Sequence, residues 1–163
     1  MSSGDTLGKF LPQSNEPPTS NPATADVRNA HPVLDFDATT NESAVFSGVM
    51  PRHYSGGGTM AYIHFAMSSA VAGDVDWDGA FERIGDDVQD IDSDGFAAAQ
   101  SVDNTTVPAT SGSVDIVSIT FTAGAQMDSV AAGEGFRFKV TRDAVSDTAV
   151  GDAELRFVEL KET

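Results

Sequence analysis

Short segments in which apolar and polar residues alternate follow one another from residue 31 to the C-terminus, with glycine turns between them. About eight such segments are present, at residues 33–38, 43–49, 59–68, 74–84, 96–102, 114–122, 134–142 and 153–161. An apolar residue at every second position is typical of a strand with one buried face. No long stretch shows the period of a helix. The pattern therefore predicts an all-β fold, a jelly-roll-like antiparallel β-sandwich of about eight strands.

The apolar positions of these segments define the expected core. The core set predicted from the alternation is Leu34, Phe36, Phe46, Ile63, Phe65, Trp77, Phe81, Ile116, Phe136, Phe138 and Val140. The last segment has no single phase, because Leu155 and Phe157 oppose Val158 and Leu160. A bulge within that strand, or burial of both of its faces, would explain the change of phase.

Residues 1–30 differ from the rest of the chain, because they contain four prolines and few large apolar side chains. The prolines prevent a continuous helix and favour extended backbone. Such a composition is typical of a flexible tail, and also of an arm that docks on a neighbouring molecule. In the second interpretation Phe10, Leu11 and Pro12 form the anchor, since apolar side chains in a polar arm gain free energy only on burial. The predicted domains are an extended N-terminal arm, residues 1–30, and a β-sandwich domain, residues 31–163.

The charge of the chain limits its partners. Its formal net charge is −16, from 25 acidic and nine basic residues. Such a surface repels phosphate backbones, so we expect no nucleic-acid partner. Cysteine is absent, which excludes disulfides and a cysteine nucleophile. No stretch approaches ~18 consecutive apolar residues and no basic start precedes an apolar run, so we expect neither a membrane span nor a secretory signal.

Two acidic stretches match the opening of a calcium-binding loop, since each has three alternating Asp residues before a glycine, at residues 74–79 and 90–95. Calcium takes several oxygen ligands from acids spaced in this way. Both stretches lack the closing Glu, and the first lies in a predicted strand, where alternate residues face water. Asp90, Asp92 and Asp94 are therefore the candidate metal ligands, with Ca²⁺ as the ion. We expect no other cofactor.

The sequence contains no nucleophile elbow, phosphate-binding loop or dinucleotide fingerprint. We therefore expect no catalytic residue and no enzyme activity, although 25 acids do not exclude a hydrolytic carboxylate pair. Arg52, His53 and Tyr54 precede a glycine run and are candidates for a contact loop. Trp77, Tyr54 and Tyr62 suit either a sugar-stacking platform or the core, and the inward phase of Trp77 favours the core.

Several stretches of the chain resemble small virion proteins of tailed phages, the proteins that decorate or cement the outside of the capsid. The likeness covers most of the chain, including the proline-rich start. It is carried by PVLDFD at 32–37, ESAVFSG at 42–48, FERI at 81–84, DSDGF at 92–96, QMD at 126–128, TRDA at 141–144 and GDAE at 151–154. The resemblance implies a jelly-roll subunit, often trimeric, that sits on capsomers or at their junctions.

Two hypotheses about function follow. In the first, the protein is a non-enzymatic structural protein of the virion, made in the host cytoplasm, which binds the capsid exterior and stabilises it. Its partners would then be itself, as a homotrimer, and the major capsid protein, with the arm as a clamp. In the alternative hypothesis, the protein is a receptor- or glycan-binding module of a phage tail fibre or baseplate.

Overall fold

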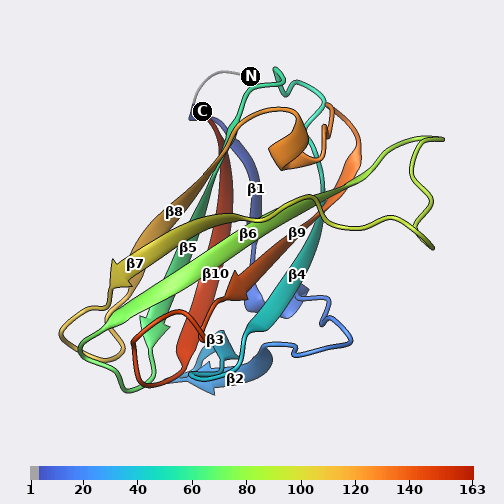
Figure 1. The fold of residues 1–163 in the computed structure, drawn as a ribbon. Coiled ribbons are helices and arrows are strands. Elements are labelled where there is room, and N and C mark those ends of the chain that lie inside the picture. The colour runs from blue at the N-terminus through green and yellow to red at the C-terminus, as the bar shows by residue number, and fades with distance from the viewer. Residues whose placement is uncertain (1–3) are drawn as a thin grey trace.

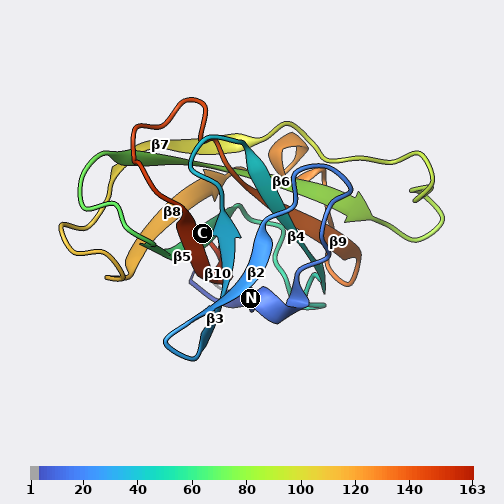
Figure 2. The ribbon, with the colours of Figure 1, turned by 90° about the horizontal axis from the view of Figure 1, so that it is seen from below.

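The computed structural model describes residues 4–163 as two antiparallel sheets packed face to face (Figures 1 and 2). The first sheet has six strands, β1 (Thr6–Phe10), β2 (Thr24–Arg28), β3 (His31–Phe36), β5 (Thr59–Met67), β8 (Asp115–Phe121) and β10 (Ala153–Glu162). The second has four, β4 (Glu42–Val49), β6 (Asp74–Ile84), β7 (Gln100–Thr106) and β9 (Gly135–Arg142). Two single-turn 3₁₀ helices, η1 (Pro12–Ser14) and η2 (Ala125–Met127), complete the elements. The described residues contain no helix long and apolar enough to span a membrane.

The predicted sandwich is confirmed, and all eight predicted segments contain a strand. One strand is shifted along the chain, since β7 begins at Gln100 rather than at Phe96. It lies at the edge of the four-stranded sheet and pairs only with β6, so most of its side chains are polar and exposed. Phe96 lies outside the strand, and its ring stacks beneath the cations of Lys139 and Arg137, at 4.6 and 5.4 Å from the centroid. An edge strand has no need of the apolar alternation from which strands are predicted.

Strand β10 is the centre of the six-stranded sheet. One of its edges pairs with β5 along nearly its whole length. Its other edge pairs first with β3, at residues 153–155, and then with β1, at residues 158–161. The register against β5 shifts between Leu155 and Phe157, which is the bulge that the mixed phase of this segment predicts. The bulge places Leu155, Val158 and Leu160 in the core and leaves Phe157 on the outer face of the sheet, 37% exposed.

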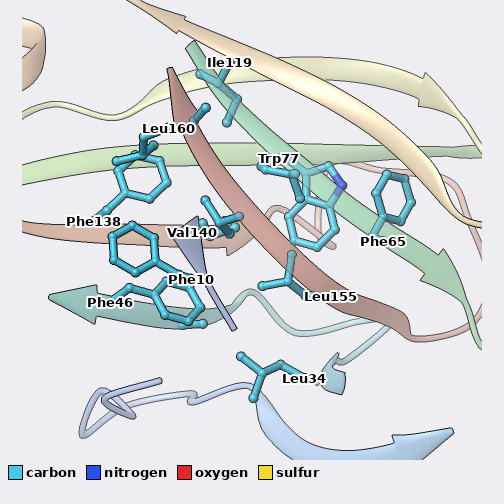
Figure 3. Packing of buried hydrophobic residues seen from close by; sticks show 14 of the residues in the cluster. Phe10, Leu34, Phe46, Phe65, Trp77, Ile119, Phe138, Val140, Leu155 and Leu160 are labelled. Carbon is cyan, nitrogen blue, oxygen red and sulfur yellow. The ribbon is translucent and has the colours of Figure 1, made fainter. Parts of the chain in front are cut away.

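The predicted arm is part of the sandwich of its own chain. For residues 4–30 this corrects the prediction that the arm docks on a neighbouring molecule. Residues 1–3 lie outside the described part of the chain. Strand β1 pairs with β10 and β2 pairs with β3. Leu7 and Phe10 are buried in the core. Phe10 stacks on Phe46 at a centroid distance of 5.4 Å (Figure 3). Phe10 also meets Phe136 edge-on at 6.3 Å. Leu7 and Phe10 therefore gain their burial within the chain, whereas Leu11 and Val27 stay exposed.

Strand β1 also brings the two ends of the chain together. The amide of Gly4 donates a hydrogen bond to the carbonyl of Glu162, at 2.6 Å, and the amide of Glu162 donates to the carbonyl of Asp5, at 2.9 Å. The start of β1 and the end of β10 lie at the same end of the sandwich, as Figure 1 shows.

The core between the sheets contains every predicted core residue except Ile116. Trp77 is fully buried and contacts the rings of Phe36 and Phe65, at centroid distances of 5.1 and 5.3 Å. Figure 3 shows Trp77 beside Phe65 in the core. Ile116 is 54% exposed, because β8 turns its odd-numbered residues inward, among them Ile119 and Phe121. This strand has apolar residues in both phases, and the prediction chose the wrong one.

A buried ion pair closes the end of the sandwich opposite the chain ends. The guanidinium of Arg142 donates to the carboxylate of Asp147 at 2.8 Å, and both side chains are excluded from solvent. The same guanidinium donates to the carbonyls of Phe36, Ala149 and Gly151. A buried charge is tolerated only when it is paired and its remaining hydrogens are bonded, and both conditions are met here.

We expect Phe10→Ala to lower the free energy of unfolding by about 3–5 kcal/mol, because it empties an aromatic site between the sheets. Leu11→Ala is the matched control, since Leu11 is 48% exposed and its loss should cost about 0.5 kcal/mol or less. Urea unfolding followed by tryptophan fluorescence measures both. A Phe10→Ala protein as stable as the parent would show that β1 does not pack in its own sandwich.

Candidate functional site

The structure separates the residues predicted for an interaction site. Phe10 and Pro12 are buried in the fold, while Leu11 is exposed. Arg52 and His53 are exposed in the turn before β5, but Tyr54 is buried. The Tyr54 hydroxyl donates to the Gly57 carbonyl, and burial raises the pKa of this phenol. Tyr54 therefore holds the turn in shape from inside, and of the three residues predicted for a contact loop only Arg52 and His53 are exposed.

The candidate calcium loop projects away from the sandwich between β6 and β7 (Figure 1). Asp90 organises it locally, because its carboxylate accepts the Asp92 amide at 3.1 Å and its carbonyl accepts the amides of Ser93 and Asp94. The three carboxylates do not converge, and residues 4–163 contain no group of three acidic or histidine side chains placed to hold a metal ion. The calcium site remains a prediction that the geometry of this loop does not favour.

The outer face of the six-stranded sheet brings polar and aromatic side chains together in two cross-strand rows. In one row Ile116 of β8 lies opposite His64 of β5, which lies opposite Phe157 of β10. In the other, Ser118 is opposite Tyr62, which is opposite Glu159. Side chains that are opposite on one face are close enough to contact the same ligand. Of the three aromatic residues considered for a sugar platform, Tyr62 alone lies on this face.

Four adjoining hollows follow β5 and β10 along this face, with volumes of about 340, 270, 280 and 460 Å³. Consecutive hollows share lining residues, first Tyr62 and Lys161, then His64 and Glu159, then Phe157. We call this row of adjoining hollows the sheet groove; it runs from the Glu162 end of β10 to its Glu154 end. At 3.3 Å per residue the groove is ~26 Å long.

The middle of the sheet groove has fixed hydrogen-bonding groups. Glu159 accepts from the Thr6 hydroxyl at 3.1 Å and lies 3.7 Å from the Lys9 ammonium. The His64 ring meets Phe157 edge-on at 5.7 Å. Burial lowers the pKa of His64, with Glu159 opposing the shift, so the imidazole is neutral at pH 7. A neutral imidazole offers one donor and one acceptor to a ligand.

The Glu154 end of the groove is more strongly charged. Arg28 pairs with Glu154 and also donates to the Met67 carbonyl at 2.9 Å. Beside them on β3, burial, together with the carboxylates of Glu154, Asp26 and Asp152, raises the pKa of Asp35 to about 6. Asp35 is therefore held ionised at neutral pH against unfavourable surroundings.

The sheet groove has the composition of a binding site. It combines aromatic and aliphatic side chains with a few fixed polar groups, as ligand sites commonly do. Phe157 and His64 were not predicted as site residues. A signal for Phe157 was present, since a large aromatic residue in the opposite phase to Val158 and Leu160 must lie outside the core unless the strand is buried on both faces.

No protein-family model and no curated protein matches the sequence. Solved structures do match the fold. The C-terminal family 6 carbohydrate-binding module of a marine laminarinase from Zobellia galactanivorans is similar at a TM-score of 0.54 and 15% identity, over 97% of this chain and 100% of that one. A family 35 carbohydrate-binding module from an environmental isolate is similar at a TM-score of 0.56 and 11% identity, over 94% and 92%.

A third similar structure is the N-terminal xylanase of Clostridium thermocellum, a family 22 carbohydrate-binding module with a catalytic module, complexed with xylohexaose. The TM-score is 0.51 at 10% identity, and the match covers 99% of this chain but 29% of that one. At such identities the likeness shows the fold. The chain has the β-sandwich of carbohydrate-binding modules.

We expect Asp35→Asn to raise the melting temperature at pH 7 and to leave it nearly unchanged at pH 4. The folded-state pKa of about 6 exceeds the ordinary value of 3.8, so the folded protein binds more protons between these values and loses stability as the pH rises through this window. Asparagine has no charge to bury, so the variant does not lose this stability as the pH rises. Melting curves recorded between pH 4 and pH 7 measure the difference, and a variant less stable than the parent at pH 7 would contradict the prediction.

Proposed function

We propose that this protein is a non-catalytic glycan-binding module and that its ligand lies in the sheet groove. One observation carries the proposal, namely the row of adjoining hollows in which Tyr62, His64 and Phe157 are interleaved with fixed polar groups. A sugar ring has apolar C–H faces and a rim of hydroxyls. Aromatic side chains cover the first, and Glu159 and neutral His64 suit the second.

The shape of the sheet groove favours an extended glycan over a single sugar. Its four hollows adjoin one another over ~26 Å of strand, which is room for several linked rings. The side chains stand on paired strands rather than on loops, so little conformational entropy is lost when a ligand binds.

The structural neighbours support the same class of function. Two of the similar structures are carbohydrate-binding modules matched over nearly their full length, and the third contains such a module and was solved with a xylo-oligosaccharide. The xylo-oligosaccharide is the ligand of that protein. The sheet groove of this chain has to be tested with its own panel of glycans.

A glycan-binding module suits the tail-fibre or baseplate alternative of the sequence analysis. The capsid clamp loses its proposed anchor, because residues 4–30 pack on their own chain. Location in a virion, trimer formation and contact with a major capsid protein remain predictions. Copy number in a particle distinguishes the capsid hypothesis from the tail-fibre hypothesis. A cement protein is present in hundreds of copies and a fibre module in a handful.

We expect Tyr62→Ala and Phe157→Ala each to weaken glycan binding by about tenfold, because each removes an apolar platform for a sugar ring. A glycan array followed by affinity electrophoresis in the polysaccharide that binds best measures the loss. Phe96→Ala is the matched control, since Phe96 is an aromatic residue stacked on the other sheet.

Unchanged binding in both groove variants would place the glycan elsewhere on the protein. An array without any ligand for the folded parent protein would contradict the proposed function itself. Melting temperatures of all three variants show whether the sandwich is intact.

A further inference from the structure

Basic residues make up a larger share of the charged side chains in the sheet groove than in the whole chain. The protein has nine Lys and Arg residues against 25 acids. Four of the nine line the groove, namely Lys9, Arg28, Arg156 and Lys161. Three acids line it too, namely Glu154, Glu159 and Glu162. The groove is thus a strip on which the two signs of charge nearly balance, on a strongly acidic molecule.

The three carboxylates of the strip already have partners. Glu154 pairs with Arg28, and Glu159 pairs with Lys9. Glu162 is buried, and its Oε1 accepts hydrogen bonds from the turn before β5, while its Oε2 is buried without a hydrogen-bond partner. A carboxylate that is paired with a basic side chain, or buried away from the surface, contributes little free attraction to a cation on a ligand.

Two cations of the strip have no such partner. Within residues 4–163, no carboxylate lies in ion-pair range of Arg156 or Lys161. Arg156 is nevertheless held in place, because it donates to the Pro32 carbonyl at 3.1 Å and lies over the Phe157 ring at 4.5 Å. A guanidinium fixed in this way presents its remaining N–H groups to a carboxylate or sulfate with little loss of entropy.

We propose that the ligand of the sheet groove is a linear acidic glycan that carries carboxylate or sulfate groups on separate sugar units. This inference rests on the proposed function and names its substrate class. Five residues of strand separate Arg156 from Lys161, a distance of ~16 Å, so one sugar does not reach both cations. The acidic surface outside the groove repels such a chain, which confines it to the strip.

The experiment compares matched pairs of polymers by isothermal titration with the full chain. Polygalacturonate is set against its methyl ester and dextran sulfate against dextran, so that the two pairs distinguish carboxylate from sulfate. We expect the parent to bind the acidic member of at least one pair, with affinity falling as NaCl rises from about 0.05 to about 0.5 M. Monomeric galacturonate should bind far more weakly than the polymer.

Arg156→Ala and Lys161→Ala should each weaken binding of the acidic polymer by about tenfold. Lys139→Ala is the matched control, since it removes the same charge from the other sheet, where Lys139 stacks on Phe96. We expect it to leave the affinity unchanged. Melting temperatures confirm that all three variants are folded.

The outcomes separate this inference from the proposed function. Equal binding of the neutral and acidic members, lost in Phe157→Ala but kept in Lys161→Ala, would overturn the acidic class and leave glycan binding in place. Single-stranded DNA bound as tightly as the acidic polymer would also overturn the inference, because charge alone would then explain the binding. Failure to bind any glycan would overturn both.

Discussion

The hydrogen-bond ladder of β10 is the constraint on which the rest of the structure depends. This strand is bonded on both edges, to β5 on one side and to β3 and then β1 on the other. Neither β1 nor β3 is long enough to cover that edge alone. The bulge next to Leu155 lies where one partner strand is exchanged for the other, and it restores the inward phase of Val158 and Leu160. A local irregularity thus allows a six-stranded sheet to be built from short pieces.

The same bulge determines the outer face of that sheet. Without it, Phe157 would share the face of Leu155 and point into the core. With the bulge, Phe157 lies beside His64 and below Arg156 on the outer face. Leu155 and Val158, on either side of the bulge, fill the core. The aromatic platform of the groove and the packing between the sheets are therefore two results of a single extra residue.

Much of the fold could be predicted from the sequence, because a sandwich requires apolar residues at alternate positions and this chain supplies them. Prediction failed where the alternation of apolar and polar residues does not show which residues are buried. Strand β7 is an edge strand with polar side chains, and β8 has apolar residues in both phases, so Ile116 was assigned to the wrong face. Strand β1 was missed because five residues between prolines and glycines give no periodic signal. The groove was harder still, since it is assembled from strands far apart in the chain, and only pairing register shows that Tyr62, His64 and Phe157 are neighbours.

The meeting of the two chain ends has a mechanical consequence. Gly4 and Glu162 are joined by a backbone hydrogen bond at one extremity of the groove, beside Lys161. A linker attached after Thr163 would leave the domain from that extremity. Any larger body to which the domain is tethered would then lie next to the Glu162 end of the sheet groove. The opposite end, at Arg28 and Glu154, would stay accessible. A long polymer bound along the sheet groove would then extend away from the body to which the domain is tethered.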